Sequence, residues 1–132
     1  MQMDRIPITE GIVSVVFVSR QNDIMQGVAL GSKSGGIFLS DGSVVARVNI
    51  WDEVTLPRTV QHRVKCRDGE LKIWNIYKAT RDDDRTRADA WTNNAGMVVE
   101  VVSDTRRRYR CSDGIGAFDP NDFVFELVLE PT

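Results

Sequence analysis

The chain has 132 residues, the usual size of one domain with one hydrophobic core, so we expect a single domain over residues 1–132. Its 17 basic and 19 acidic residues give a net charge of −2, which gives no electrostatic reason to expect a nucleic acid or an anionic membrane as partner. Residues 1–7 lack the apolar stretch of a signal peptide, and no run approaches the roughly 20 apolar residues of a transmembrane helix. We therefore expect a cytoplasmic protein.

Alternation of polar and apolar residues with a period of two predicts about eight β-strands. The alternating segments are rich in Val, Ile, Phe, Trp and Tyr, which suit a pleated, half-buried surface. In chain order they cover residues 11–19, 28–30, 37–39, 43–51, 60–66, 71–78, 96–102, 107–118 and 122–130.

Turn residues between these segments support an all-β chain. Asp41-Gly42 and Asp68-Gly69 predict hairpin turns, because aspartate and glycine both tolerate positive φ. Residues 80–95 are polar, interrupt the alternation and have room for one short helix. Short strands joined by hairpins indicate a sandwich or a barrel.

Two cysteines and one histidine are the obvious candidate metal ligands. Cys66 and Cys111 each begin a Cys-x-Asp-Gly sequence, but they lie far apart in the chain, and a structural zinc site needs four Cys or His ligands. The three aspartates at 82–84 lack the spacing of a calcium loop. We therefore predict no metal and no cofactor and, because cytoplasmic thiols are normally reduced, no disulfide.

His62 is the only histidine, so any Ser-His-Asp or Cys-His device would have to use it, and no G-x-S-x-G motif is present. It lies between Val60 and Val64 on the apolar face of its strand. Two interpretations stay equal: a hydrogen-bonded interior histidine, or a polar group in a cavity. Residues 31–36 lack the spacing of a phosphate-binding loop. The basic cluster 106–110 is interpreted as a solvated strand edge rather than a nucleic-acid site.

Three motifs follow one another in an informative order: residues 37–46 (IFLSDGSVVA), 66–71 (CRDGEL) and 105–114 (TRRRYRCSDG). They resemble the L-[YF]-D-x-x-G-x-x-V-G hairpin, the L-x-D-G-x-[IL] turn and the G-G-T-G-x-Y-x-G-x-x-G motif of the allene oxide cyclase/dirigent-type β-barrels. The aromatic strand at 123–129 also fits. The chain departs from the family pattern where glycines are replaced by Ala46, Asp104, Arg106, Arg107 and Cys111.

The resemblance implies an eight-stranded antiparallel, calycin-like β-barrel with a central cavity. Its bacterial branch includes cofactor-free cyclases of polyketide and antibiotic biosynthesis, among them the spirotetronate-type [4+2] cyclases (Diels-Alderases). An intramolecular cycloaddition needs no nucleophile; it needs a polyene held folded, which can lower the barrier by about 7–11 kcal/mol. The expected function is therefore ring closure of a small apolar polyketide-like substrate, with a homodimer as one expected assembly.

By alternation, the wall of such a cavity would consist of residues on the inward face of each strand. His62, Asn75 and Tyr77 are its polar members and would hydrogen-bond to the substrate. A register shift of one residue would bring Trp74 and Ile76 inward instead. The other wall residues would be Val60, Val64, Ile73, Phe118, Phe123, Phe125 and Leu127.

Two other functions stay open. A lipocalin-like barrel would bind an apolar metabolite in the same cavity without turnover, so saturable binding without product would indicate it. An interaction module, such as an immunity or adaptor protein, would have a solid interior, so an interior without a ligand-sized cavity would favour it.

Overall fold

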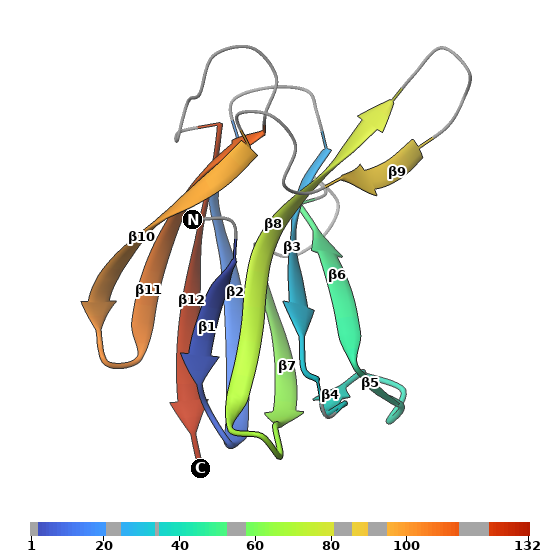
Figure 1. The fold of residues 1–132 in the computed structure, drawn as a ribbon, viewed down its shortest axis with the longest axis vertical. Helices are drawn as coiled ribbons and strands as arrows, with labels where there is room; N and C mark the ends of the chain where they lie inside the picture. The colour runs from blue at the N-terminus through green and yellow to red at the C-terminus, as the bar shows by residue number, and fades with distance from the viewer. Residues whose placement is uncertain are drawn as a thin grey trace.

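The computed structural model of the chain shows an all-β fold of two antiparallel sheets (Figure 1). It describes residues 3–20, 25–33, 35–52, 58–80, 86–89, 95–113 and 122–132. Within these ranges there are twelve strands and no helix, and hence no helix that is long and apolar enough to cross a membrane. The predicted all-β class is confirmed.

The smaller sheet has five strands in the order β1-β8-β3-β6, with β9 paired to β8 beyond the end of β1. These strands are β1 (Asp4–Pro7), β3 (Met25–Gly31), β6 (Arg47–Trp51), β8 (Glu70–Thr80) and β9 (Thr86–Asp89). β9 falls inside the polar segment where the sequence has room for a short helix. The rest of that segment, residues 81–85 and 90–94, lies outside the described residues.

The larger sheet has seven strands in the order β10-β11-β12-β2-β7-β4-β5. These strands are β2 (Glu10–Arg20), β4 (Ile37–Phe38), β5 (Val44–Val45), β7 (Thr59–Lys65), β10 (Ala95–Ser103), β11 (Arg106–Asp113) and β12 (Phe123–Pro131). The long ladder between β12 and β2 joins the C-terminal strand to the N-terminal part of the chain, so the two ends of the sequence meet in one sheet.

One bent hairpin, from β3 to β6, belongs to both sheets. Its base, β3 and β6, pairs in the five-stranded sheet, whereas its tip, β4 and β5, pairs beside β7 in the other. Gly36 makes this crossing possible, because a Cβ atom there would lie 2.0 Å from the carbonyl oxygen of Lys65. The Lys65 amide donates to the Gly36 carbonyl oxygen at 2.8 Å, so only a glycine allows this approach.

The predicted closed, eight-stranded barrel is wrong in its closure and in its number of strands. Among the described strands, the seven-stranded sheet ends at β10 and β5 and the five-stranded sheet ends at β1 and β6, with no ladder that joins the sheets into a ring. Alternation shows which face of a strand is buried, but a strand carries no sequence signal for its partner. The bend at Ala46 also divides one predicted strand, 43–51, into β5 and β6.

A single core fills the space between the two sheets. Tyr109, Phe123 and Phe125 are fully buried, with ring centroids 4.8 Å apart between Tyr109 and Phe125 and 5.5 Å apart between Phe123 and Phe125. Aliphatic side chains of the five-stranded sheet pack into the same cluster: Ile6, Val28, Leu30, Leu71 and Ile73. Where a central cavity was expected, these described side chains therefore pack against one another.

Candidate ligand pocket at His62

A notch opens beside β7 because its neighbour β4 ends early. β4 pairs with β7 only at Ile37 and Val64, and the chain then turns at residues 40–42, where Gly42 has a φ of 88°. The Gly42 amide donates to the Leu39 carbonyl oxygen at 3.0 Å, which closes the turn. β7 continues past this turn, so its edge from Val60 to Arg63 has no strand partner on that side among the described strands.

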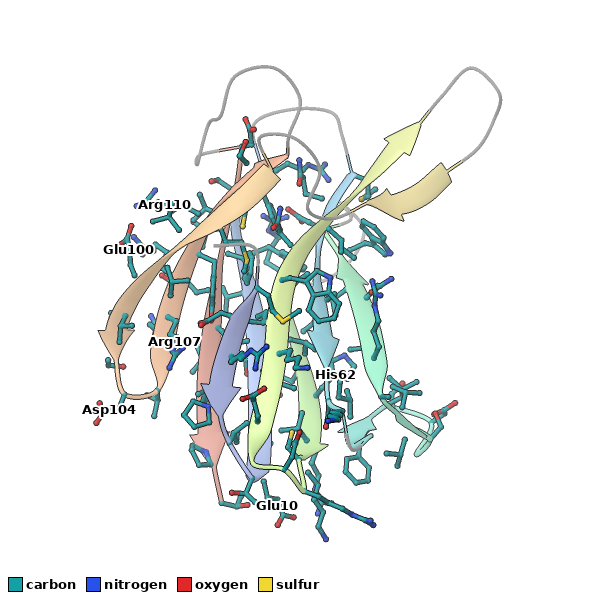
Figure 2. The ribbon with its side chains drawn as sticks, viewed as in Figure 1. Glu10, His62, Glu100, Asp104, Arg107 and Arg110 are labelled. Atoms are coloured by element: carbon teal, nitrogen blue, oxygen red, sulfur yellow. The ribbon has the colours of Figure 1, made fainter. Side chains whose placement is uncertain are left out.

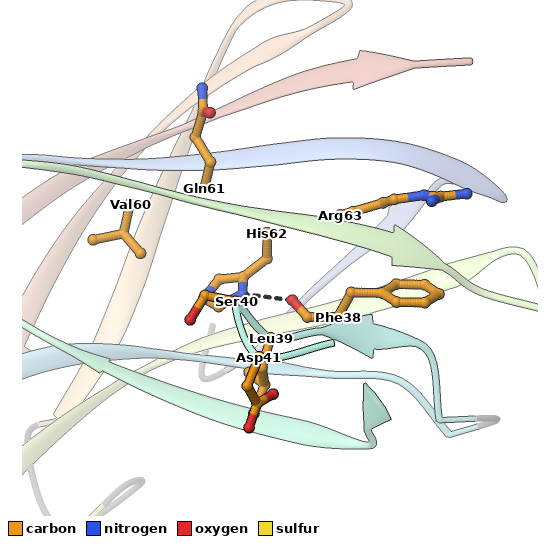
Figure 3. A pocket seen from close by; sticks show the side chains of 8 residues that line it. All are labelled: Phe38, Leu39, Ser40, Asp41, Val60, Gln61, His62 and Arg63. Atoms are coloured by element: carbon orange, nitrogen blue, oxygen red, sulfur yellow. Dashed lines mark hydrogen bonds between the residues drawn. The ribbon is translucent and has the colours of Figure 1, made fainter. Parts of the chain in front are cut away.

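The notch is a pocket of about 550 Å³, within the size range of small-molecule sites (Figure 3). One wall comes from the edge of β7 and the other from the end of β4 and the turn after it. The lining residues are Phe38, Leu39, Ser40, Asp41, Val60, Gln61, His62 and Arg63.

His62 supplies a fixed polar atom in this pocket. Its Nδ1 lies 3.0 Å from the carbonyl oxygen of Phe38 (Figure 3). A carbonyl oxygen only accepts hydrogen bonds, so Nδ1 carries the proton. In the neutral ring, Nε2 then holds a lone pair, and no described protein group binds it. The backbone bond therefore sets both the tautomer and the orientation of the ring.

The surroundings of His62 combine apolar surface with polar groups that already have partners. The Arg63 guanidinium lies over the Phe38 ring, 5.1 Å from its centroid, and pairs with Glu10 at 3.1 Å. The Gln61 amide donates to the Ser14 hydroxyl at 3.1 Å. Leu39, Val60 and Phe38 supply the apolar part of the lining.

Asp41 places a carboxylate on the rim. It accepts hydrogen bonds from the hydroxyl and the amide of Ser43, at 2.6 and 2.9 Å, and these bonds lower the pKa of the Asp41 carboxyl. The rim of the pocket is therefore anionic at its Asp41 end at neutral pH.

The structure brings together two of the residues predicted to line a cavity and separates them from the others. Val60 and His62 line the notch. Tyr77 lies on β8, but its side chain is outside the described part, and Phe118 lies outside the described residues altogether. The remaining six are buried in the interior between the sheets: Val64, Ile73, Asn75, Phe123, Phe125 and Leu127.

Asn75 links the two sheets by a hydrogen bond. It is buried, and its Nδ2 donates to the carbonyl oxygen of Ser112 on β11 at 3.4 Å. Trp74 is on the opposite face of β8, where its ring lies over Gly31 at 3.1 Å from the position of a Cβ atom. Ile76 lies on the same face as Trp74, and the Ile76 side chain is fully buried.

Sequence reasoning did not find the wall formed by Phe38, Leu39, Ser40 and Asp41. The Asp41-Gly42 turn was predicted, but nothing in the sequence places it beside His62, which follows Gly42 by 20 residues in the chain. The early end of β4 and the crossing at Gly36 bring the two together.

The cysteines form no metal site with other described residues, among which no cluster of three or more His, Cys, Asp or Glu side chains could hold a metal ion. Both thiols are free and buried, and burial raises the pKa of Cys66 and of Cys111. Protonated, buried thiols are poor nucleophiles.

A scan against protein-family models, a search of curated proteins and a search of solved structures each found no match to this chain. The resemblance to the allene oxide cyclase/dirigent-type barrels therefore stays a prediction. The function has to be argued from the geometry of the pocket itself.

Proposed function

We propose that this chain binds a small, largely apolar molecule in the pocket at His62. The observation that carries the proposal is the pocket of about 550 Å³ in which the Phe38 carbonyl oxygen holds the His62 ring in place. Most small-molecule sites combine an apolar lining with a few fixed polar groups, and this one matches that description.

The tautomer of His62 specifies the polar group of the ligand. Because Nδ1 donates to Phe38, the neutral ring offers Nε2 as an acceptor. The best ligand therefore carries a hydroxyl or N–H donor on an apolar body. The anionic rim at Asp41 adds a preference against ligands with a carboxylate or phosphate near that end.

Matched probes test this proposal. We expect 2-naphthol, which has a hydroxyl donor, to shift the NMR signals of the pocket residues and to bind about fivefold more tightly than 2-methoxynaphthalene, since one such hydrogen bond contributes about 1 kcal/mol. In His62→Phe this difference should vanish, whereas Val18→Ala, on an exposed position of β2, should keep it. If neither probe shifts pocket signals, or if the difference persists in His62→Phe, binding at this site is excluded.

Ring closure is the catalytic form of the same proposal. The lining combines Phe38, Leu39 and Val60 with an imidazole whose Nε2 can accept a hydrogen bond from a hydroxyl of the substrate, so the pocket can hold a polyene in a folded orientation. A linear polyene incubated with the protein should cyclise faster than in buffer, and His62→Phe should reduce this acceleration. An unchanged cyclisation rate together with saturable binding would show that the chain binds the polyene without cyclising it.

For a chain that acts as such a cyclase, we propose a cytoplasmic location and a role in polyketide biosynthesis. Two buried free thiols without a disulfide support a reducing compartment.

A further inference from the structure

β10 is the outermost strand of the seven-stranded sheet. It pairs with β11 along one edge, and no described strand pairs with its other edge. Figure 1 shows the β10–β11 hairpin extending away from the rest of the fold, with β10 on the outside. A row of backbone N–H and C=O groups on such an edge is a template for another strand.

The side chains of β10 do not protect this edge. Of the five large apolar side chains that the described residues expose, three lie on β10: Val98, Val101 and Val102, with exposed fractions of 44%, 69% and 55%. Monomeric proteins protect their edges with lysine, proline or inward charges. From Met97 to Val102 the one charge is Glu100, and the Arg110 guanidinium binds it at 2.5 Å (Figure 2).

The other sheet edges are better protected. β1 has four residues and contains Pro7, which has no amide proton to donate. β6 exposes Arg47 and Asn49, and β5 has only two residues. Of these four edges, β10 is therefore the one most suited to pairing.

We propose that β10 pairs in antiparallel register with β10 of a second copy of this chain, around a two-fold axis at Val99. Val98 then lies opposite Glu100 of the second copy, and Met97 lies opposite its Val101. This isologous contact uses the free edge of both copies and closes at a dimer.

Charge and backbone geometry select this register. An axis at Glu100 would place two carboxylates directly opposite each other, which is destabilising. An axis at Val101 would run the new ladder through the irregularity between Val101 and Ser103. An axis at Val98 would leave the exposed Val101 opposite Ala95, at the start of the strand.

The axis at Val99 also places acidic and basic side chains of the two copies in one row across the dimer. Within one copy, Val98 lies opposite Arg110 and Glu100 lies opposite Arg108. In the dimer, each Glu100 lies between Arg108 of its own copy and Val98 of the other, with Arg110 of the other copy next in the row. The two Glu100 carboxylates near the axis thus lie in rows with four guanidinium groups; Arg108 also binds Glu126 at 2.7 Å, and Arg110 binds Glu100 of its own copy.

Sedimentation velocity and cross-linking test the proposal. We expect a dimer that dissociates on dilution, and Val101→Lys should weaken it about tenfold or more, since a lysine protects a strand edge. Because Val101 is exposed, the variant should keep the unfolding midpoint of the wild type when both are measured at a concentration at which they are monomeric. Val18→Lys, at an exposed position on β2, should dimerise as the wild type does.

Cysteine pairs test the register. Under mild oxidation, a mixture of Val98→Cys and Glu100→Cys chains should form a disulfide-linked dimer, whereas each variant alone should not, because a disulfide needs Cα atoms about 4.4–6.8 Å apart. The native cysteines are buried, so we expect them to form no cross-link under these conditions. A chain that stays monomeric at every concentration, or a dimer that Val101→Lys leaves unchanged, overturns the proposal. Equal cross-linking of the single variants overturns the axis at Val99.

Discussion

Tyr109 lies inside a run of basic residues that the sequence suggested was a solvated edge, yet its side chain is fully buried. Its hydroxyl donates to Oδ2 of Asp4 at 2.7 Å, and Arg107 donates to the same oxygen at 2.8 Å. The ring stacks on Phe125. In an alternating strand, every second residue of the basic run has to face inward, and Arg107 and Tyr109 are those residues.

We predict that Tyr109→Phe lowers the free energy of unfolding by about 1.5–3 kcal/mol, because it removes a hydrogen bond to a charged group while the ring packing stays. Urea unfolding monitored by far-ultraviolet circular dichroism measures this change. Val44→Thr, at an exposed position on β5, should stay within about 0.5 kcal/mol of wild type. A loss of similar size in both variants would show that the Asp4 contact contributes little.

At the scale of elements, the bent hairpin decides whether the pocket exists. Gly36 lets the hairpin tip reach β7, and the tip carries Phe38, whose carbonyl oxygen holds His62. Alternation predicted the strands on both sides of this crossing. It did not predict the crossing, because a glycine that is needed for a close backbone approach looks like any loop glycine in the sequence.

We predict that Gly36→Ala destabilises the chain by about 1–3 kcal/mol, because the new Cβ atom forces β4 away from the Lys65 carbonyl oxygen. The displacement should also change the NMR signals of the His62 ring. Lys33→Ala, an exposed position in the same loop, should change neither the stability nor these signals. If the NMR signals of the His62 ring stayed unchanged in Gly36→Ala, the crossing at Gly36 would not be what positions His62 in the pocket.

At the scale of the whole molecule, burial between the sheets changes the acidity of three side chains. Burial raises the pKa of Tyr109, and the hydrogen bond to Asp4 and the charge of Asp4 raise it further. Burial also raises the pKa of Cys66 and Cys111. All three groups are neutral when protonated, so the folded chain holds their protons to higher pH than the unfolded chain does.

We predict that the stability these groups contribute is fully present below their unfolded pKa values, about 8.5 for cysteine and about 10 for tyrosine, and is lost as the pH rises above them. Each group that ionises only on unfolding adds a slope of about 1.4 kcal/mol per pH unit. Urea unfolding measured from neutral to alkaline pH checks this, and Tyr109→Phe should flatten the curve above about pH 10. An equally steep curve in Tyr109→Phe would contradict the assignment of that slope to Tyr109.

The class of the fold, most of the strands and the hairpin turns were predictable from the sequence, because period-two alternation and Asp-Gly turns are local signals. The sequence also identified His62 as the one imidazole on an apolar face. The tertiary structure was needed to show that the described strands form two open sheets, that Phe123 and Phe125 fill the interior, and that His62 faces a notch beside the Asp41 turn. Strand pairing and backbone crossings join residues that lie far apart in the chain. Alternation indicates which face of a strand is buried, but it does not indicate which strands pair.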